Sequence, residues 1–215
     1  MPAPSLIAWV DALGAVLLRP GDRLTLGGPP RRSGDGGDES ADLPLAAPLS
    51  PVQAAVVRAG EGWALEERGA LTALNDGGAF TLGRDGAVRG TATAPHPLSA
   101  AAVVRIDSAH RPAPGWGPVR LEHAVIAAGP VIVGGGTDCH VRVRGATGQL
   151  LFRPGPDGWQ VRGAEPTSGS EPGAAAPAGG SAALEWRPAA AGDVLTGGGV
   201  SLRLEALPSR ESSAG

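Results

Sequence analysis

The sequence predicts an all-β protein made of two tandem β-sandwiches, and three observations carry that prediction. Almost every stretch of 8 to 12 residues contains a Gly or Pro, with 35 Gly and 21 Pro among 215 residues, so long amphipathic helices are not expected. The apolar residues, 42% of the chain, gather in short runs between these breakers, as in many short strands. One order of Gly and Trp motifs occurs twice, which indicates two units of one kind.

Three motifs define each copy of the repeat. In the first copy they are Leu26-Gly27-Gly28, Gly62-Trp63-Ala64-Leu65 and Thr81-Leu82-Gly83-Arg84. In the second copy they are Val133-Gly134-Gly135, Gly158-Trp159-Gln160-Val161 and Leu195-Thr196-Gly197-Gly198. The spacings differ by a polar stretch at 31–41 and a Gly/Pro/Ala/Ser run at 164–181, which fit insertions in surface loops. We therefore expect sandwiches at 1–107 and 108–207, packed end to end around 107–117, with a disordered tail at 208–215.

Alternation and turn chemistry predict the strands of the first unit. Two apolar runs meet at Gly14 as a hairpin, and Pro20-Gly21-Asp22 is a turn because Pro fixes φ and Gly adopts positive φ. A second hairpin turns at Ala59-Gly60-Glu61-Gly62, and Asn75-Asp76-Gly77-Gly78 is a further turn. In order, the expected strands are 5–12, 15–19, 23–26, 42–45, 54–58, 63–67, 87–93 and 103–106.

The second unit shows the same kind of pattern. Residues 140–144 and 200–205 alternate strictly between polar and apolar, which is typical of half-buried strands. Trp63 and Trp159 hold equivalent places in the two copies, so we expect both to pack in hairpins rather than contact a ligand. In order, the expected strands are 119–127, 131–133, 140–144, 149–153, 159–162, 182–187 and 200–205.

Composition bounds the partners and the compartment. The net charge is −3 with a pI near 5.8, so no broad basic field exists for nucleic acid. All 18 basic residues are Arg, which excludes lysine Schiff bases and a P-loop lysine. The single Cys139 excludes an intramolecular disulfide and indicates a reducing compartment. The sequence offers no apolar span for a membrane and no signal peptide at its start, so we expect a soluble, cytoplasmic protein.

Residues of catalytic type do not assemble into a recognisable motif. Asp138-Cys139-His140 is the densest group, but neighbours on a strand face opposite ways, so we expect a buried Cys139 and a solvent-facing His140. His96, His110 and His123 lack metal-ligand spacing. The sequence therefore predicts no enzyme, no cofactor and no metal site; a cleft with convergent His, Asp and Cys side chains would revive an enzymatic interpretation.

The order of these segments resembles the forkhead-associated (FHA) family, over residues 6–105 and more weakly over 118–207. Residues 21–28 resemble the strand that leads into the first recognition loop of that family, and 42–45 its next extended piece. Ser50-Pro51-Val52-Gln53 stands where the family has Ser-x-x-His, with Gln53 in place of His. Asn75, the only Asn in the chain, stands at the family's turn Asn. The resemblance implies an all-β sandwich that recognises phosphothreonine peptides.

The same resemblance assigns the site residues. It implies that the Ser50 hydroxyl and the guanidinium of Arg31 or Arg32 contact phosphate, that Asn75 contacts the peptide backbone, and that the residue at position 53 supports the loop. Gly28 stands where the family's loop Arg is expected, and loss of that residue removes charge-assisted hydrogen bonds of about 1.5–3 kcal/mol each.

Two functions follow as hypotheses. The first is a non-catalytic protein-interaction module of FHA type, with phosphothreonine recognition weakened or lost and a protein or phosphothreonine-containing peptide as partner. The alternative is a structural or assembly scaffold that forms homo-oligomers through exposed edge strands.

Overall fold

The computed structural model describes residues 3–29, 31–32, 38–74, 78–96, 99–107, 123–164 and 185–207. These residues form strands in three large sheets and one two-stranded ribbon, with a single 3-10 turn, η1 (Arg84–Gly86). The all-β prediction is confirmed. Among the described residues, no helix has the length and apolar character that a membrane span needs.

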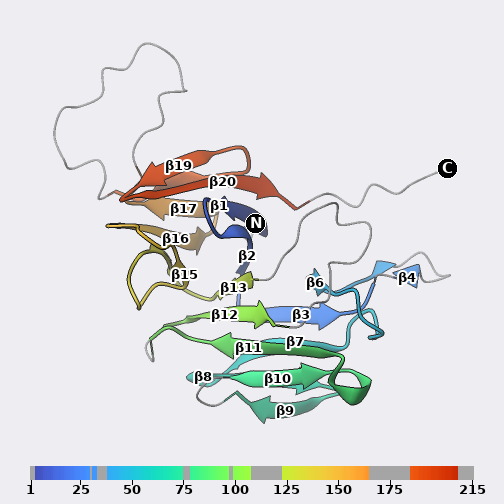
Figure 1. The fold of residues 1–215 in the computed structure, drawn as a ribbon. Helices are drawn as coiled ribbons and strands as arrows, with labels where there is room; N and C mark the ends of the chain where they lie inside the picture. Colours follow the sequence, from blue (N-terminus) through green and yellow to red (C-terminus); the bar gives the residue numbers. More distant parts are fainter. Residues whose placement is uncertain are drawn as a thin grey trace, which may run out of the picture.

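A long central sheet runs through the molecule, from β10 near the bottom of Figure 1 to β19 near the top, and one five-stranded outer sheet packs on each of its faces. In spatial order, the central sheet contains β10 (Ala79–Leu82), β11 (Val88–Thr93), β12 (Ala101–Ile106), β13 (His123–Ala127), β2 (Gly14–Pro20), β1 (Leu6–Val10), β20 (Val200–Ala206) and β19 (Val194–Gly197). The first outer sheet contains β6 (Leu43–Pro44), β3 (Arg23–Gly27), β7 (Ala54–Ala59), β8 (Gly62–Glu67) and β9 (Ala70–Ala73). The second contains β15 (Val141–Arg142), β14 (Val131–Gly134), β16 (Gln149–Gly155), β17 (Gly158–Arg162) and β18 (Arg187–Ala189). The ribbon pairs β4 (Arg31–Arg32) with β5 (Asp38–Glu39).

The two outer sheets have the same topology, as the repeated motifs predict. In each, a short edge strand pairs parallel to the first long strand, which is followed by an antiparallel hairpin and a last edge strand. Strands β3 and β14 end at equivalent glycines, Gly27 and Gly134, and the hairpins β7–β8 and β16–β17 place Trp63 and Trp159 at equivalent positions. The repeat in the sequence is therefore a repeat in structure.

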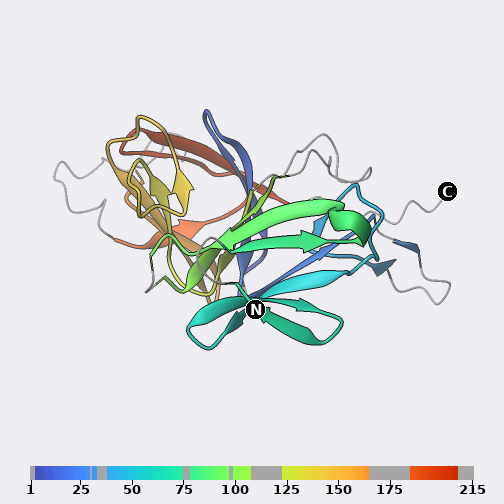
Figure 2. The ribbon, with the colours of Figure 1, turned by 60° about the horizontal axis from the view of Figure 1, so that its bottom comes forward.

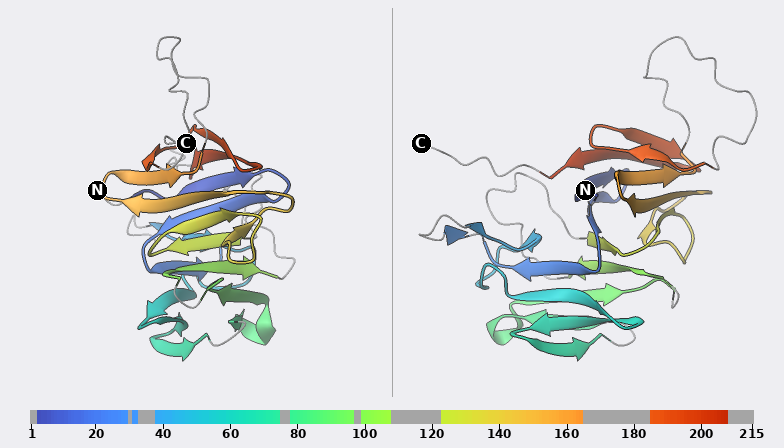
Figure 3. Two further views of the ribbon diagram at one scale, coloured as in Figure 1. Left: turned by 90° about the vertical axis from the view of Figure 1, so that its left-hand side faces the viewer. Right: turned by 180° about the vertical axis from the view of Figure 1, so that it is seen from behind.

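The central sheet joins the two repeats. Strands β2 and β13 pair parallel, with Val16 opposite His123. On one side of this pair lie β1, β20 and β19, and on the other lie β12, β11 and β10. The N-terminal hairpin β1–β2 thus pairs with the C-terminal hairpin β19–β20, and the blue strands lie beside the red ones in Figures 2 and 3.

Each face of the central sheet contributes to a different hydrophobic core. Leu18 on β2 packs with residues of the second outer sheet, whereas its neighbour Leu17 packs with residues of the first. One sandwich therefore draws its core from within residues 23–127, with a contribution from β1 and β2, and the other is completed by both ends of the described chain. A strand buried on both faces must be apolar at consecutive positions, as in Ala15–Leu18 and Ala124–Ala127.

The two sandwiches follow one another along the molecule, and the central sheet is common to both. The expected division at residue 107 falls between β12 and β13, which are paired neighbours in the central sheet. The two repeats share that sheet, because β1–β2 and β12–β13 carry apolar side chains on both faces and each must be covered twice. The expected tail at 208–215 lies outside the described residues.

Both tryptophans of the repeat lie in the cores, which confirms their predicted packing role. Trp159 is 2% exposed and its indole Nε1–H donates to the Pro4 carbonyl at 2.6 Å. Trp63 is 7% exposed and belongs to the other core. A buried indole with its N–H bonded is the usual state of a packed tryptophan.

Candidate functional site

A loop at one end of the first outer sheet carries the Ser50 motif. Residues 47–53, here called the Ser50 loop, lie against the backbone at Gly27 and Gly28. A Cβ on Gly27 would lie 1.9 Å from the Pro51 carbonyl oxygen, and one on Gly28 would lie 2.4 Å from the Leu49 oxygen. The two glycines are therefore needed because the chains touch through their backbones.

Backbone hydrogen bonds hold this loop on both sides. The Gly28 N–H donates to the Ser50 carbonyl at 2.7 Å, and the Ala41 N–H donates to the Pro51 carbonyl at 3.1 Å. The Gln53 N–H donates to Leu26 at 2.9 Å. A loop bonded in this way is already ordered before it meets a partner, so binding costs little additional conformational entropy.

Gln53 supports the loop with its side chain. Its Oε1 accepts a hydrogen bond from the Ser50 N–H at 3.2 Å, and its Nε2 donates to Glu67 Oε1 at 2.6 Å. At position 53, to which the FHA resemblance assigns a supporting role, an amide makes these two contacts. An amide accepts and donates at once, which is the combination that the loop and strand β8 require here.

The residues expected to bind a phosphopeptide fall into three groups. Ser50 is exposed on the loop. Arg31 and Arg32 form strand β4, three residues beyond Gly28, and only their backbone is described. Asn75 lies outside the described residues. Its described neighbour Leu74 donates its N–H to Trp63, at the opposite end of β8 from Glu67 and the Ser50 loop. The described flank of Asn75 is therefore not brought beside Ser50.

Two further residues near Ser50 were not singled out from the sequence. Val52 is 44% exposed on the loop. Gly83 packs against the loop, since a Cβ there would lie 2.6 Å from Leu49 Cδ2, and the exposed Arg84 follows it at the start of η1. Val52 lies inside the quoted Ser-x-x-Gln motif and Arg84 inside a repeat motif, but the contact of Gly83 with Leu49 depends on the packing of segments that are distant in sequence.

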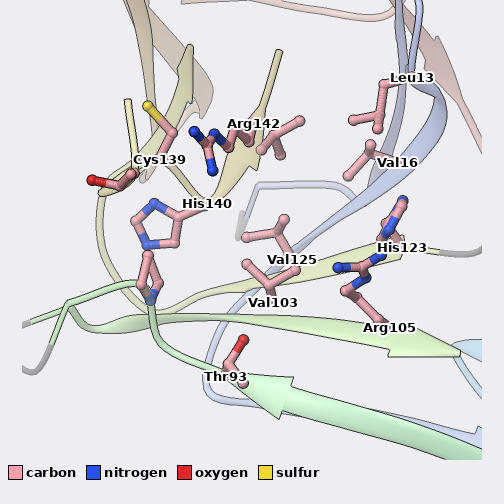
Figure 4. A pocket seen from close by; sticks show the side chains of 13 residues that line it. Leu13, Val16, Thr93, Val103, Arg105, His123, Val125, Cys139, His140 and Arg142 are labelled. Carbon is pink, nitrogen blue, oxygen red and sulfur yellow. The ribbon is translucent and has the colours of Figure 1, made fainter. Parts of the chain in front are cut away.

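A second concave surface lies where the second outer sheet meets the central sheet. This cavity, of about 430 Å³, is here called the Arg142 pocket. Figure 4 shows Val103 and Val125 between Arg105 and His123 on one side and Arg142 and His140 on the other. Its lining residues are Leu13, Val16, Thr93, Pro95, Val103, Arg105, His123, Val125, Thr137, Cys139, His140, Val141 and Arg142.

His140 is buried, which corrects the expectation that it faces solvent. It is 7% exposed, and both ring nitrogens are bonded: the Ile132 N–H donates to Nδ1 at 3.0 Å, and Nε2 lies 2.7 Å from Ser99 Oγ. Since Nδ1 accepts, Nε2 carries the proton and donates. Strand alternation does not apply because β15 begins only at Val141, after the loop that contains Cys139 and His140.

Cys139 and His140 do not form a nucleophile–base pair. Burial lowers the pKa of His140 to about 4, against an opposing effect of Asp138, so the ring is neutral near pH 7. Burial also raises the pKa of the Cys139 thiol. Neither nitrogen of His140 is free to take a proton from sulfur, and a reactive thiolate needs a lowered pKa. Although Cys139 and His140 both line the pocket, they are therefore not arranged for acid–base chemistry.

Metal ligation and known relatives add no further assignment. Among the described residues, no group of three or more His, Cys, Asp or Glu side chains could hold a metal ion. Comparison of the chain with protein-family models, with curated proteins and with solved structures finds no match.

Proposed function

We propose that this protein is a non-catalytic protein-interaction module of FHA type that contacts its partner through the Ser50 loop without requiring phosphate. The observation that carries the proposal is the bond from the Ser50 N–H to Gln53 Oε1, together with the backbone bonds to Gly28 and Ala41. They fix an exposed loop on a rigid sheet. Loops held by a rigid scaffold are the usual carriers of recognition in β-sandwiches.

We propose binding that does not require phosphate because the position at which the resemblance expects an arginine beside Ser50 holds no cationic side chain. Gly28 occupies the position at which the resemblance expects an Arg, and Gly28 is held against the Leu49 carbonyl. The flank of Asn75 leaves the sheet at the other end of β8. The loop instead presents the hydroxyl of Ser50 and the side chain of Val52, with Arg84 behind Gly83.

Measuring the affinity for pairs of peptides that differ only in a phosphate group tests this function. Peptides in phosphothreonine and threonine forms are titrated against the wild type and against Val52→Ser. For each peptide that binds the wild type, we expect the phosphothreonine and threonine forms to bind with about the same affinity. Val52→Ser should weaken binding about fivefold to tenfold, because Val52 loses its apolar contact. Leu71→Ser is the matched control, since Leu71 is also an exposed apolar side chain, 62% exposed, but lies on the edge strand β9 rather than on the Ser50 loop.

Two results would overturn the proposal. If no peptide binds, or if Leu71→Ser weakens binding as much as Val52→Ser, the Ser50 loop is not the recognition surface. If binding depends strongly on the phosphate and is lost in Ser50→Ala, the module retains phosphothreonine recognition and the phosphate-independent version is wrong.

A specific observation favours assembly as a second candidate function. Strand β9 is the last strand of its outer sheet, and all four of its residues, Ala70 to Ala73, are exposed. It contains no charged residue and no proline, although edge strands of soluble proteins usually carry such protection. We propose that a second copy of this chain pairs with β9 in this case.

Sedimentation over a concentration series tests this assembly. We expect a monomer–dimer equilibrium in the wild type and a monomer in Leu71→Lys, because a charge on the edge opposes pairing. Val52→Lys, which places the same charge on the Ser50 loop, should leave the dimer unchanged. A wild type that stays monomeric at the highest concentration reached would remove this candidate.

A further inference from the structure

We infer that the Arg142 pocket is a binding site for a small amphipathic anion, with a carboxylate or phosphate monoester as head and a short apolar body. This site is separate from the Ser50 loop: it is formed by the central sheet and the second outer sheet, whereas the loop belongs to the first.

Register explains why two basic side chains lie on one face of the central sheet. Arg105 on β12 lies directly opposite His123 on β13, and Val103 lies opposite Val125. Because residues two apart on a strand share a face, Arg105 and His123 point the same way as Val103 and Val125. Arg142 approaches from β15 across the pocket (Figure 4). Two guanidinium groups from different sheets therefore border one cavity.

The positive charge of the pocket is not neutralised within the described structure. No ion pair to Arg105 or Arg142 occurs among the described residues, and the described lining residues include no Asp or Glu. The nearest acid along the loop is Asp138, whose Oδ1 lies 4.0 Å from Cys139 Sγ. Arginine binds carboxylate and phosphate through a planar pair of N–H donors, so each of these guanidinium groups offers a contact to an anionic head.

The floor of the pocket indicates that the part of the ligand behind its anionic head is apolar. Val16 and Val125 are buried, and Val103 and Leu13 are partly exposed to the cavity. A volume of about 430 Å³ lies within the usual range of small-molecule sites. The apolar floor and the cationic rim together select an amphipathic anion over an inorganic one, because contact with Val103 and Leu13, which keep exposed apolar surface, removes that surface from water.

His140 forms a fixed wall rather than a charged contact. Its two nitrogens are bonded to Ile132 and Ser99, so the imidazole links β14 to the segment that precedes β12. Cys139 lies in the same lining with 6% exposure. Its thiol therefore reports on occupancy, since a bound ligand would shield it from a neutral alkylating reagent.

A series of eight-carbon probes tests the inference on the full chain. Octanoate, octyl phosphate, octanol and octylammonium share a body and differ in the head group. We expect both anions to bind saturably by calorimetry and to slow alkylation of Cys139 by iodoacetamide, octanol to bind more weakly, and octylammonium not to bind. The tighter of the two anions identifies the head group.

Charge-removing variants locate the site. Arg142→Gln and Arg105→Gln should each weaken octanoate about tenfold, the loss expected for one charge-assisted contact. Arg58→Gln is the matched control, because Arg58 is an exposed arginine on β7 of the other outer sheet. Both pocket arginines are exposed at the rim, so their replacement does not disturb a core.

Three outcomes would overturn the inference. Octanol binding as tightly as octanoate would show an apolar site without anion selectivity. Equal effects of Arg58→Gln and Arg142→Gln would show a general charge effect on the chain. Absence of binding by every probe, with unchanged alkylation of Cys139, would show that the cavity has no ligand of this class.

Discussion

The imidazole of His140 and the hydroxyl of Ser99 lie 2.7 Å apart and join the two layers of the second sandwich. The same place in the first repeat is held by Asp42, which also precedes the short parallel strand of its sheet. Asp42 Oδ2 accepts from the Thr25 N–H at 2.9 Å, as His140 Nδ1 accepts from the Ile132 N–H at 3.0 Å. Two different side chains therefore satisfy the equivalent backbone donor of the two repeats.

Acid should destabilise the protein through His140. Its pKa is about 4 in the folded protein and 6.5 in its ordinary state, so the unfolded chain binds the proton more readily between these values. Stability is then full above pH 6.5 and falls as the pH drops toward 4, by up to about 3 kcal/mol. Urea unfolding at a series of pH values measures this loss.

His140→Gln separates this effect from that of the carboxylates, which titrate in the same range. The variant should be less stable at neutral pH, because the Ser99 and Ile132 bonds are disturbed. Its stability should nevertheless fall less steeply between pH 6.5 and 4. Parallel curves for the wild type and His140→Gln would show that His140 takes up no proton on unfolding.

Gly27→Ala should destabilise the first sandwich and displace the Ser50 loop. Its Cβ would lie 1.9 Å from the Pro51 oxygen, and relief of such overpacking costs about 1–3 kcal/mol. Gly62→Ala is the matched control, because the nearest atom to its Cβ is the Ala59 oxygen at 3.9 Å. Thermal unfolding compares the two; equal midpoints would show that the loop does not press on Gly27.

Cys139 should react slowly in the folded protein. The thiol is buried and its pKa is raised, so less thiolate is present at pH 8 than in a free cysteine. Alkylation by iodoacetamide, followed by mass spectrometry, should be slow in buffer and fast in urea. Equal rates in the two conditions would mean that the loop at 136–140 opens readily.

Local pattern was sufficient to predict much of the fold. Turn chemistry at Gly14 and at 59–62 located the hairpins β1–β2 and β7–β8, and the two Gly-Trp motifs located equivalent strands. These signals are short-range, because hairpins and alternation depend on neighbours in sequence.

Pairing between distant strands was not predictable in the same way. Apolar runs at 15–18 and 124–127 indicate burial on both faces, but not that β2 and β13 pair with each other. The Arg142 pocket depends on that pairing, since Arg105, His123 and Arg142 come from three strands. The burial of His140 was missed because alternation was applied to a loop residue.

Hydrogen exchange in Leu17→Ala and Leu18→Ala tests the shared central sheet most directly. These neighbours on β2 are both fully buried but face opposite cores, and each loss should cost about 2–5 kcal/mol. Leu17→Ala should raise exchange most in β3, β7 and β8, and Leu18→Ala most in β14, β16 and β17. If both variants raised exchange in the same strands, a single sheet separating two cores would be contradicted.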